Sequence, residues 1–229
     1  FVIISLWGFN FIRQSEKSMI YAGMARETAH QLGTPVSSLM GWIKLLRDQK
    51  SDTSMILSAM DDDVSRLSEI SERFSKIGSN PKLKNITLYD LSSESINYMK
   101  NRLPKKSKID LILNGNRDIN IQGDWTLLRW SIENLLKNAI DAIGIGKGNI
   151  SINILSNKKY STILITDSGK GIPRKDWKNI FSPGFSSKRR GWGLGLSLTK
   201  RIIKEIHKGE IHVFSSKPGK TVFQINLPV

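Results

Sequence analysis

A histidine with the spacing of an exposed helical residue stands in the stretch Ala29-His30-Gln31-Leu32-Gly33-Thr34-Pro35. The apolar residues that follow it recur at steps of three and four and predict one buried stripe, formed by Val36, Leu39, Ile43 and Leu46. At about 100° per residue, His30 lies about 180° from Leu39, so we expect its imidazole to face water. Pro35 lacks a backbone N–H and should bend the helix near Gln31. Most histidines on amphipathic helices are ordinary surface residues, so other motifs must decide the role of this one.

Two asparagines four residues apart, Asn134 and Asn138, fall on one face of a helix that we expect to run from its N-cap, Asp124, to Ile143. Two amide oxygens one turn apart can bind a hard cation. Mg²⁺ prefers oxygen ligands and fills its other positions with water and substrate phosphates. Helical asparagines are usually surface residues, but this pair comes shortly before glycine-rich loops and is therefore a candidate metal site.

The segment Asp167-Ser168-Gly169-Lys170-Gly171-Ile172-Pro173 follows directly on a predicted strand, which places the carboxylate of Asp167 at the strand end. A buried carboxylate can accept a hydrogen bond from an exocyclic amine, which suits adenine. The two glycines allow the backbone to approach a ligand closely. Taken alone, the pattern is equally typical of an ordinary turn.

A second glycine-rich stretch, Gly191-Trp192-Gly193-Leu194-Gly195-Leu196, opens a helix that we expect from Leu194 to His207. The N–H groups at the start of a helix attract phosphate oxygens. Lys188, just before the stretch, could neutralise phosphate charge in a transition state. Glycines before a helix are also common without any function, and their spacing fits neither a P-loop nor a Rossmann motif.

Taken in order, these stretches resemble the phosphoacceptor, asparagine, first glycine and second glycine boxes of the sensor histidine kinases of two-component systems. Residues 180–188 resemble the phenylalanine box of that family, and residues 218–221 resemble its closing glycine turn. The resemblance covers nearly all of the chain after Arg13. It implies an ATP-dependent protein histidine kinase that phosphorylates His30 from Mg-ATP and passes the phosphoryl group to an aspartate on the receiver domain of a response regulator.

The same resemblance implies a role for each motif residue. Asn138 becomes the Mg²⁺ ligand with Asn134 nearby, and Asp167 becomes the reader of adenine. Gly169 and Gly171 line the base pocket. Gly191, Gly193 and Gly195 border the lid over the phosphates. Lys188 and Leu196 complete the nucleotide-binding set, and Lys188 is also the catalytic cation. The implied cofactors are ATP and Mg²⁺.

The sequence departs from the family pattern directly after the phosphoacceptor, where an acidic residue is usual and Gln31 stands here. Glutamine can orient an imidazole but cannot take its proton. Either the neutral imidazole attacks with hydrogen-bond help alone, which we favour, or Glu27 substitutes one turn earlier. Thr34 matches the place where the family can position water to dephosphorylate its partner. A local hydrogen bond to a helix carbonyl is the alternative role for Thr34.

The front of the chain should position His30. Residues 1–12 are apolar apart from Ser5 and Asn10 and precede Arg13 and Lys17, so we expect the end of a transmembrane helix at a cytoplasmic (inner) membrane, with a buried helix start as the alternative. Residues 13–80 should form the dimerisation and phosphotransfer domain. Its second helix carries apolar residues at helical spacing, namely Met60, Val64, Leu67, Ile70, Phe74 and Ile77. Two such helices form a hairpin that we expect to pair with a second copy in a four-helix bundle, unless the hairpin packs on the following domain.

The rest of the chain, residues 81–229, should form the ATP-binding domain. Strands are expected at 86–89, 109–113, 119–122, 150–155, 161–166, 210–214 and 221–227. We expect Asp90 to cap a helix that ends near Leu103. The order of elements predicts helices on one face of a mainly antiparallel sheet. The expected fold is therefore α+β, a helical hairpin followed by an α/β sandwich of the Bergerat type.

The amino-acid composition excludes several classes of site and partner. The chain has 229 residues and no cysteine, which excludes disulfides and thiolate metal sites and fits a reducing cytoplasm. Its formal net charge of +15 favours anionic partners, but the sequence has no zinc-finger spacing and no RNA-binding signature, so we expect no nucleic acid partner. His207 and His212 lie outside every motif and should be structural. The rival functions are an ATPase of the same fold and a degenerate scaffold without histidine phosphorylation.

Overall fold

The computed structural model describes residues 2–48, 52–78, 81–103, 107–186 and 193–229. The chain divides into two compact units, residues 1–80 and residues 81–229.

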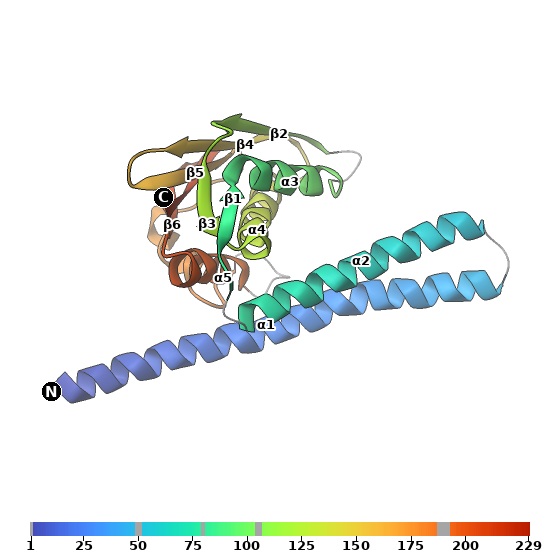
Figure 1. Cartoon of the computed structure of the whole chain (residues 1–229), viewed down its shortest axis with the longest axis horizontal. Coiled ribbons are helices and arrows are strands. Elements are labelled where there is room, and N and C mark those ends of the chain that lie inside the picture. Colours follow the sequence, from blue (N-terminus) through green and yellow to red (C-terminus); the bar gives the residue numbers. More distant parts are fainter. Residues whose placement is uncertain (1, 49–51, 79–80, 104–106, 187–192) are drawn as a thin grey trace. The chain divides into compact units, whose positions relative to one another are not determined.

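The first unit is a hairpin of two long antiparallel helices, α1 (Val2–Arg47) and α2 (Thr53–Gly78) (Figure 1). Pro35 lies inside α1 and is buried. The indole N–H of Trp42 donates a 3.2 Å hydrogen bond to Oδ2 of Asp63, which is a polar contact between the two helices. Ile56 and Met24 are also buried, among the described side chains of this unit. The predicted helical hairpin is therefore confirmed.

A single chain covers the predicted buried stripe of α1 only in part, since Leu39 and Leu46 are partly buried. Val36 and Ile43 are 45% and 41% exposed, and on α2 Val64 and Phe74 are 54% and 43% exposed. Two helices can cover only the faces that they turn toward each other, so the rest of each apolar surface needs a further layer. The hairpin thus presents apolar side chains that the described residues of one chain leave uncovered.

Among the residues that the structure describes, no helix is both long enough and apolar enough to cross a membrane.

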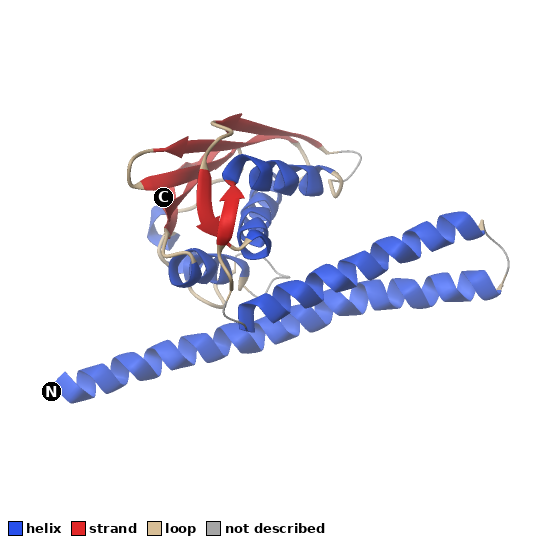
Figure 2. Cartoon of the chain, in the orientation of Figure 1, coloured by secondary structure: helices blue, strands red, loops and turns tan. Residues whose placement is uncertain are grey.

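The second unit is built on a five-stranded sheet in the order β2-β4-β5-β7-β6 (Figure 2). Its strands are β2 (Lys108–Gly115), β4 (Lys147–Ser156), β5 (Tyr160–Asp167), β6 (Glu210–Lys217) and β7 (Lys220–Pro228). Strands β2 and β4 are parallel, and the other pairs are antiparallel. A separate antiparallel pair consists of β1 (Lys84–Thr87) and β3 (Asn120–Gly123). The mainly antiparallel sheet is as predicted.

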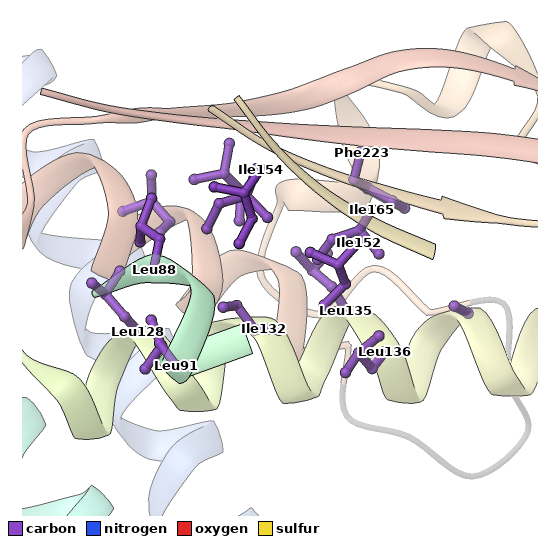
Figure 3. Close-up of a cluster of buried hydrophobic side chains, with 14 of the residues drawn as sticks. Leu88, Leu91, Leu128, Ile132, Leu135, Leu136, Ile152, Ile154, Ile165 and Phe223 are labelled. Carbon is purple, nitrogen blue, oxygen red and sulfur yellow. The ribbon is translucent and has the colours of Figure 1, made fainter. Parts of the chain in front are cut away.

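Three helices lie on one face of this sheet: α3 (Leu88–Lys100), α4 (Trp125–Ile143) and α5 (Gly195–Arg201) (Figure 1). Isoleucines alternate with polar residues along β4 and β5, so every second side chain is buried beneath the helices. Figure 3 shows the resulting core, in which α3 and α4 contribute Leu88, Leu91, Leu128, Ile132, Leu135 and Leu136, and the sheet contributes Ile152, Ile154, Ile165 and Phe223. This packing holds α4 along the sheet and fixes where its polar side chains emerge.

The starts and ends of the helices follow local hydrogen bonds. The carboxylate of Asp124 accepts from the N–H of Leu127 at 3.1 Å, which confirms its predicted role as the N-cap of α4. Asp90 is not a cap, because α3 begins at Leu88, whose N–H donates to the carbonyl of Ile119 at 3.0 Å. Asp90 instead lies in the first turn, where a carboxylate is favoured by the helix dipole.

The last helix is shorter than predicted. α5 ends at Arg201 and continues as a π-helical turn over Ile202–Ile206. Lys208 follows with a positive φ of 55°, so the chain reverses there into β6. A π-helical turn is hydrogen-bonded i→i+5 in place of i→i+4, and over a single turn the apolar pattern is too short to separate the two.

Candidate functional site

The two asparagines are half-buried on α4, and Asn134 lies against the start of α5. Nδ2 of Asn134 donates a 2.9 Å hydrogen bond to Oγ1 of Thr199. A Cβ atom on Gly195 would overlap Oδ1 of Asn134, so a larger residue there would force the amide of Asn134 to move. The amide of Asn134 therefore contacts two successive turns of α5. Asn138 follows one turn later on the same face of α4.

Asp167 is the last residue of β5 and is 3% exposed. Its Oδ1 accepts a 2.8 Å hydrogen bond from the N–H of Gly169. Burial raises the pKa of Asp167 above its ordinary value, while the hydrogen bond from Gly169 acts in the opposite direction. A carboxylate kept in a buried position at a strand end is suited to accept a hydrogen bond from a neutral N–H donor of a ligand.

The loop after β5 is fixed on two sides. The N–H of Lys170 donates to the carbonyl of Ala142, near the end of α4, at 3.1 Å. A Cβ atom on Gly169 would lie 2.6 Å from Cβ of Ala142, so only glycine permits this approach. On the other side, Gly171 has a φ of +82° and lies against the backbone of Lys217 in the β6–β7 turn.

Sequence reasoning missed two serines that hold this loop. Oγ of Ser168 accepts a 2.9 Å hydrogen bond from the N–H of Asn149, and Oγ of Ser216 accepts a 2.8 Å hydrogen bond from the N–H of Ile172. Both serines look like ordinary loop or strand residues, and their partners are 19 and 44 residues away in sequence. Only the tertiary fold brings them together.

The second glycine stretch meets the segment that follows Phe181. The N–H of Gly184 donates to the carbonyl of Gly193 at 3.2 Å, and Gly193 has a φ of +63°. Phe181 is buried, and its ring lies edge-on to the ring of Phe223 with 6.3 Å between the ring centroids. Leu196 is partly buried and packs against the core cluster. Lys188 and Gly191, which the sequence also indicated, lie outside the described residues.

The phosphoacceptor candidate lies in the other unit. His30 is exposed on α1, so its ring is open to solvent. Gln31 is half-buried and Thr34 is exposed. No group of three or more potential metal ligands from His, Cys, Asp and Glu occurs in the described part of the chain.

His207 is buried and has a structural position, as expected. Its Nε2 accepts a 3.0 Å hydrogen bond from the N–H of Asp124, and its Nδ1 lies 2.9 Å from the carbonyl of Ile202. Because Nε2 accepts, the ring is neutral with its proton on Nδ1, which donates to Ile202. Burial lowers the pKa of His207, and the bond to Ile202 and the Asp124 carboxylate oppose that shift. His212 is exposed.

Two family models match the chain. The His Kinase A (phospho-acceptor) domain matches residues 22–80, and the histidine kinase-, DNA gyrase B-, and HSP90-like ATPase matches residues 123–229. Among curated proteins, the chain is 28% identical to sporulation kinase C of Bacillus subtilis over 95% of this chain and 51% of that protein. It is 30% identical to the sensor histidine kinase ZraS of Salmonella typhimurium over 95% of this chain and 48% of that protein. The chain thus spans about half the length of these relatives.

The chain is also similar to solved structures of histidine kinases. The catalytic domain of the histidine kinase ThkA is 30% identical with a TM-score of 0.59, over 65% of this chain and 96% of that domain. A longer ThkA chain, solved in complex with the response regulator protein TrrA, is 25% identical with a TM-score of 0.59, over 98% of this chain and 66% of that chain.

Proposed function

This chain belongs to the sensor histidine kinases of two-component systems, and from that premise we propose that it uses Mg-ATP to phosphorylate His30. The observation that carries the proposal is the exposed imidazole of His30 inside the segment that matches the phosphoacceptor family. An ATPase that only changes conformation needs no such residue. The products are ADP and a phosphohistidine.

In the ATP-binding unit, the proposed base site is the loop after β5. Asp167 offers its buried carboxylate to the exocyclic amine of adenine, a pairing that excludes bases with a carbonyl at that position. Gly169 and Gly171 allow the backbone to lie close to the ring. This arrangement is supported by the 2.8 Å bond from Gly169 to Asp167, which holds the carboxylate in place.

The proposed phosphate site lies between α4 and the second glycine stretch. Asn138 is the proposed Mg²⁺ ligand, with Asn134 nearby, and amide oxygens on one helix face fit the preference of Mg²⁺ for oxygen. When bound, the metal supplies charge neutralisation for the phosphates. Lys188, Gly191, Gly193, Gly195 and Leu196 complete the proposed nucleotide-binding set, with Lys188 neutralising the charge of the transferred group.

The chemical step is a direct transfer. A ring nitrogen of neutral His30 supplies the electron pair that forms the N–P bond, and the bond between the γ-phosphorus and the bridging oxygen breaks. That electron pair leaves on ADP. Gln31 can orient the ring through a hydrogen bond but cannot accept its proton. The proton on the other ring nitrogen of His30 therefore leaves after the N–P bond has formed, to water or to a carboxylate such as Glu27. Positioning and charge neutralisation carry most of the catalysis of such transfers.

The next acceptor in the proposal is an aspartate on the receiver domain of a response regulator. Support comes from the resemblance over 98% of this chain to a ThkA chain solved with the response regulator protein TrrA. We also propose that two copies pair through α1 and α2, because both helices keep exposed apolar side chains. Thr34 is the residue that we propose for positioning water in the reverse, phosphatase reaction. The membrane attachment expected from residues 1–12 stays a prediction.

Labelled ATP tests the kinase proposal. The wild type should acquire acid-labile, alkali-stable label, and His30→Gln should acquire none. His212→Gln is the matched control, because His212 is also exposed but lies outside the phosphoacceptor segment, and it should be labelled as the wild type is. Hydrolysis of ATP without a phosphoenzyme, or label that persists in His30→Gln, would show that the protein is an ATPase of this fold or uses another acceptor.

A further inference from the structure

The polar contact between Asn134 and Thr199 is a further feature that the motifs did not indicate. The two residues are 65 positions apart, and their 2.9 Å bond joins the middle of α4 to α5. Thr199 is 1% exposed, so water does not compete for its hydroxyl. A buried hydroxyl that accepts from a half-buried amide fixes the orientation of that amide.

The contact determines which way the amide of Asn134 faces. Nδ2 donates to Thr199, and a Cβ atom on Gly195 would lie 2.3 Å from Oδ1 and 2.8 Å from Nδ2, so the whole amide lies close against α5. Gly195 and Thr199 are four residues apart and share one face of α5. The amide is therefore held by one hydrogen bond and by close packing against the same short helix.

We infer that Thr199 is a positioning residue, which orients the amide of Asn134 and sets the start of α5 against the phosphate half of the nucleotide site. This inference rests on the proposed function. The second glycine stretch ends where α5 begins, and Asn138 lies one turn from Asn134 on α4. A change in the orientation of Asn134 thus alters the space between the asparagines and the start of α5. Asp167, on β5, is not part of this contact.

Removal of the Thr199 hydroxyl should weaken binding at the phosphate half of the nucleotide site and leave binding at the adenine half unchanged. Thr199→Val keeps the branched shape and removes the acceptor, so Asn134 can rotate. Because a lost hydrogen bond of this kind is worth about 1 kcal/mol, we expect KM for Mg-ATP in autophosphorylation to rise about fivefold to tenfold. The affinity for adenosine, measured by NMR titration, should stay within about twofold of the wild type, since adenosine lacks the phosphates.

Two further variants separate this role from packing. Thr199→Ser restores the hydroxyl and should return KM for Mg-ATP to near the wild-type value. Thr162→Val is the matched control, because Thr162 also makes a 2.9 Å side-chain hydrogen bond with an asparagine, Asn226, on the sheet. It should leave KM for Mg-ATP and the affinity for adenosine unchanged.

The inference is overturned if Thr199→Val behaves as the wild type, if Thr199→Ser is impaired as much as Thr199→Val, or if adenosine and Mg-ATP lose affinity equally. Should Thr199→Val fail to fold, Asn134→Ala removes the other partner, and an unchanged KM in that variant overturns the inference as well. If the wild type binds Mg-ATP but His30 is never phosphorylated, the proposed function fails. Calorimetric affinities for Mg-ATP then replace KM in the same comparison.

Discussion

The backbone N–H of Gly219 donates a 2.8 Å hydrogen bond to the carbonyl oxygen of Gly169, which joins the β6–β7 turn to the loop after β5. The turn and the loop therefore form one unit at the end of the sheet. Gly171 packs against the backbone beside the same turn, and a Cβ atom there would come within 2.8 Å of the carbonyl carbon of Lys217. By contrast, a Cβ atom on Gly219 would meet only open space.

This difference predicts unequal effects of two alanine substitutions. Both glycines have a positive φ, +82° at Gly171 and +83° at Gly219, so each alanine should cost about 1 kcal/mol of stability through backbone strain. Gly171→Ala also displaces the loop, and we expect it to weaken Mg-ATP binding at least about tenfold. Gly219→Ala should bind almost normally. Calorimetric titration and thermal melts measure both effects, and equal losses of affinity would contradict the proposed base pocket.

Asp167→Asn should lower the nucleotide affinity without lowering the stability of the folded chain. Burial raises the pKa of Asp167, so the charged carboxylate lowers the stability of the folded chain at neutral pH. A group with a raised folded pKa contributes full stability below its unfolded value and loses it as the pH rises through its folded value. Asparagine keeps an oxygen for the N–H of Gly169. We therefore expect an unchanged or higher melting temperature at pH 7, and a nucleotide affinity about 10- to 100-fold lower. A melting temperature several degrees lower would refute this account.

The stability of the ATP-binding unit should fall in mild acid because of His207. Burial lowers the pKa of His207, so the unfolded chain takes up a proton in a range where the folded chain does not. Stability is therefore complete above the unfolded value of about 6.5 and is lost as the pH falls from there toward the folded value. Denaturant melts across this range should show the slope. His207→Gln should be less stable at pH 7 and flatten the profile, whereas the exposed His212→Gln should leave the wild-type slope.

The exposed apolar side chains of the hairpin predict self-association. Val64 is 54% exposed on α2, so Val64→Lys should place a charge in the proposed dimer interface. Analytical ultracentrifugation at micromolar concentration should show a dimer for the wild type and a shift toward monomer for Val64→Lys. Ser65→Lys adds the same charge at the next, exposed position and should remain dimeric. A monomeric wild type would remove the proposal.

Much of the fold could be predicted from local pattern. Alternating isoleucines indicated β4 and β5, because each strand buries one face against the helices. Asp124 was recognised as an N-cap because its side chain needs only the amide three residues later. In these places the residues that decide the structure are neighbours in the sequence.

Other features depend on distant partners. The start of α3 at Leu88 is set by a hydrogen bond to Ile119, which no local rule contains. For the same reason Thr199 was not among the candidate site residues, since its partner Asn134 lies on another helix. The motifs indicated which residues could touch a nucleotide, and the residues that hold them were visible only in three dimensions.

Every side chain of the buried core cluster lies between Ile86 and Leu227. A fragment that begins at Pro81 therefore keeps the whole of that core, and it should melt cooperatively as an independent molecule. Such a fragment would capture Mg-ATP yet have no acceptor of its own, so the nucleotide should persist uncleaved until a separately produced hairpin bearing His30 is added.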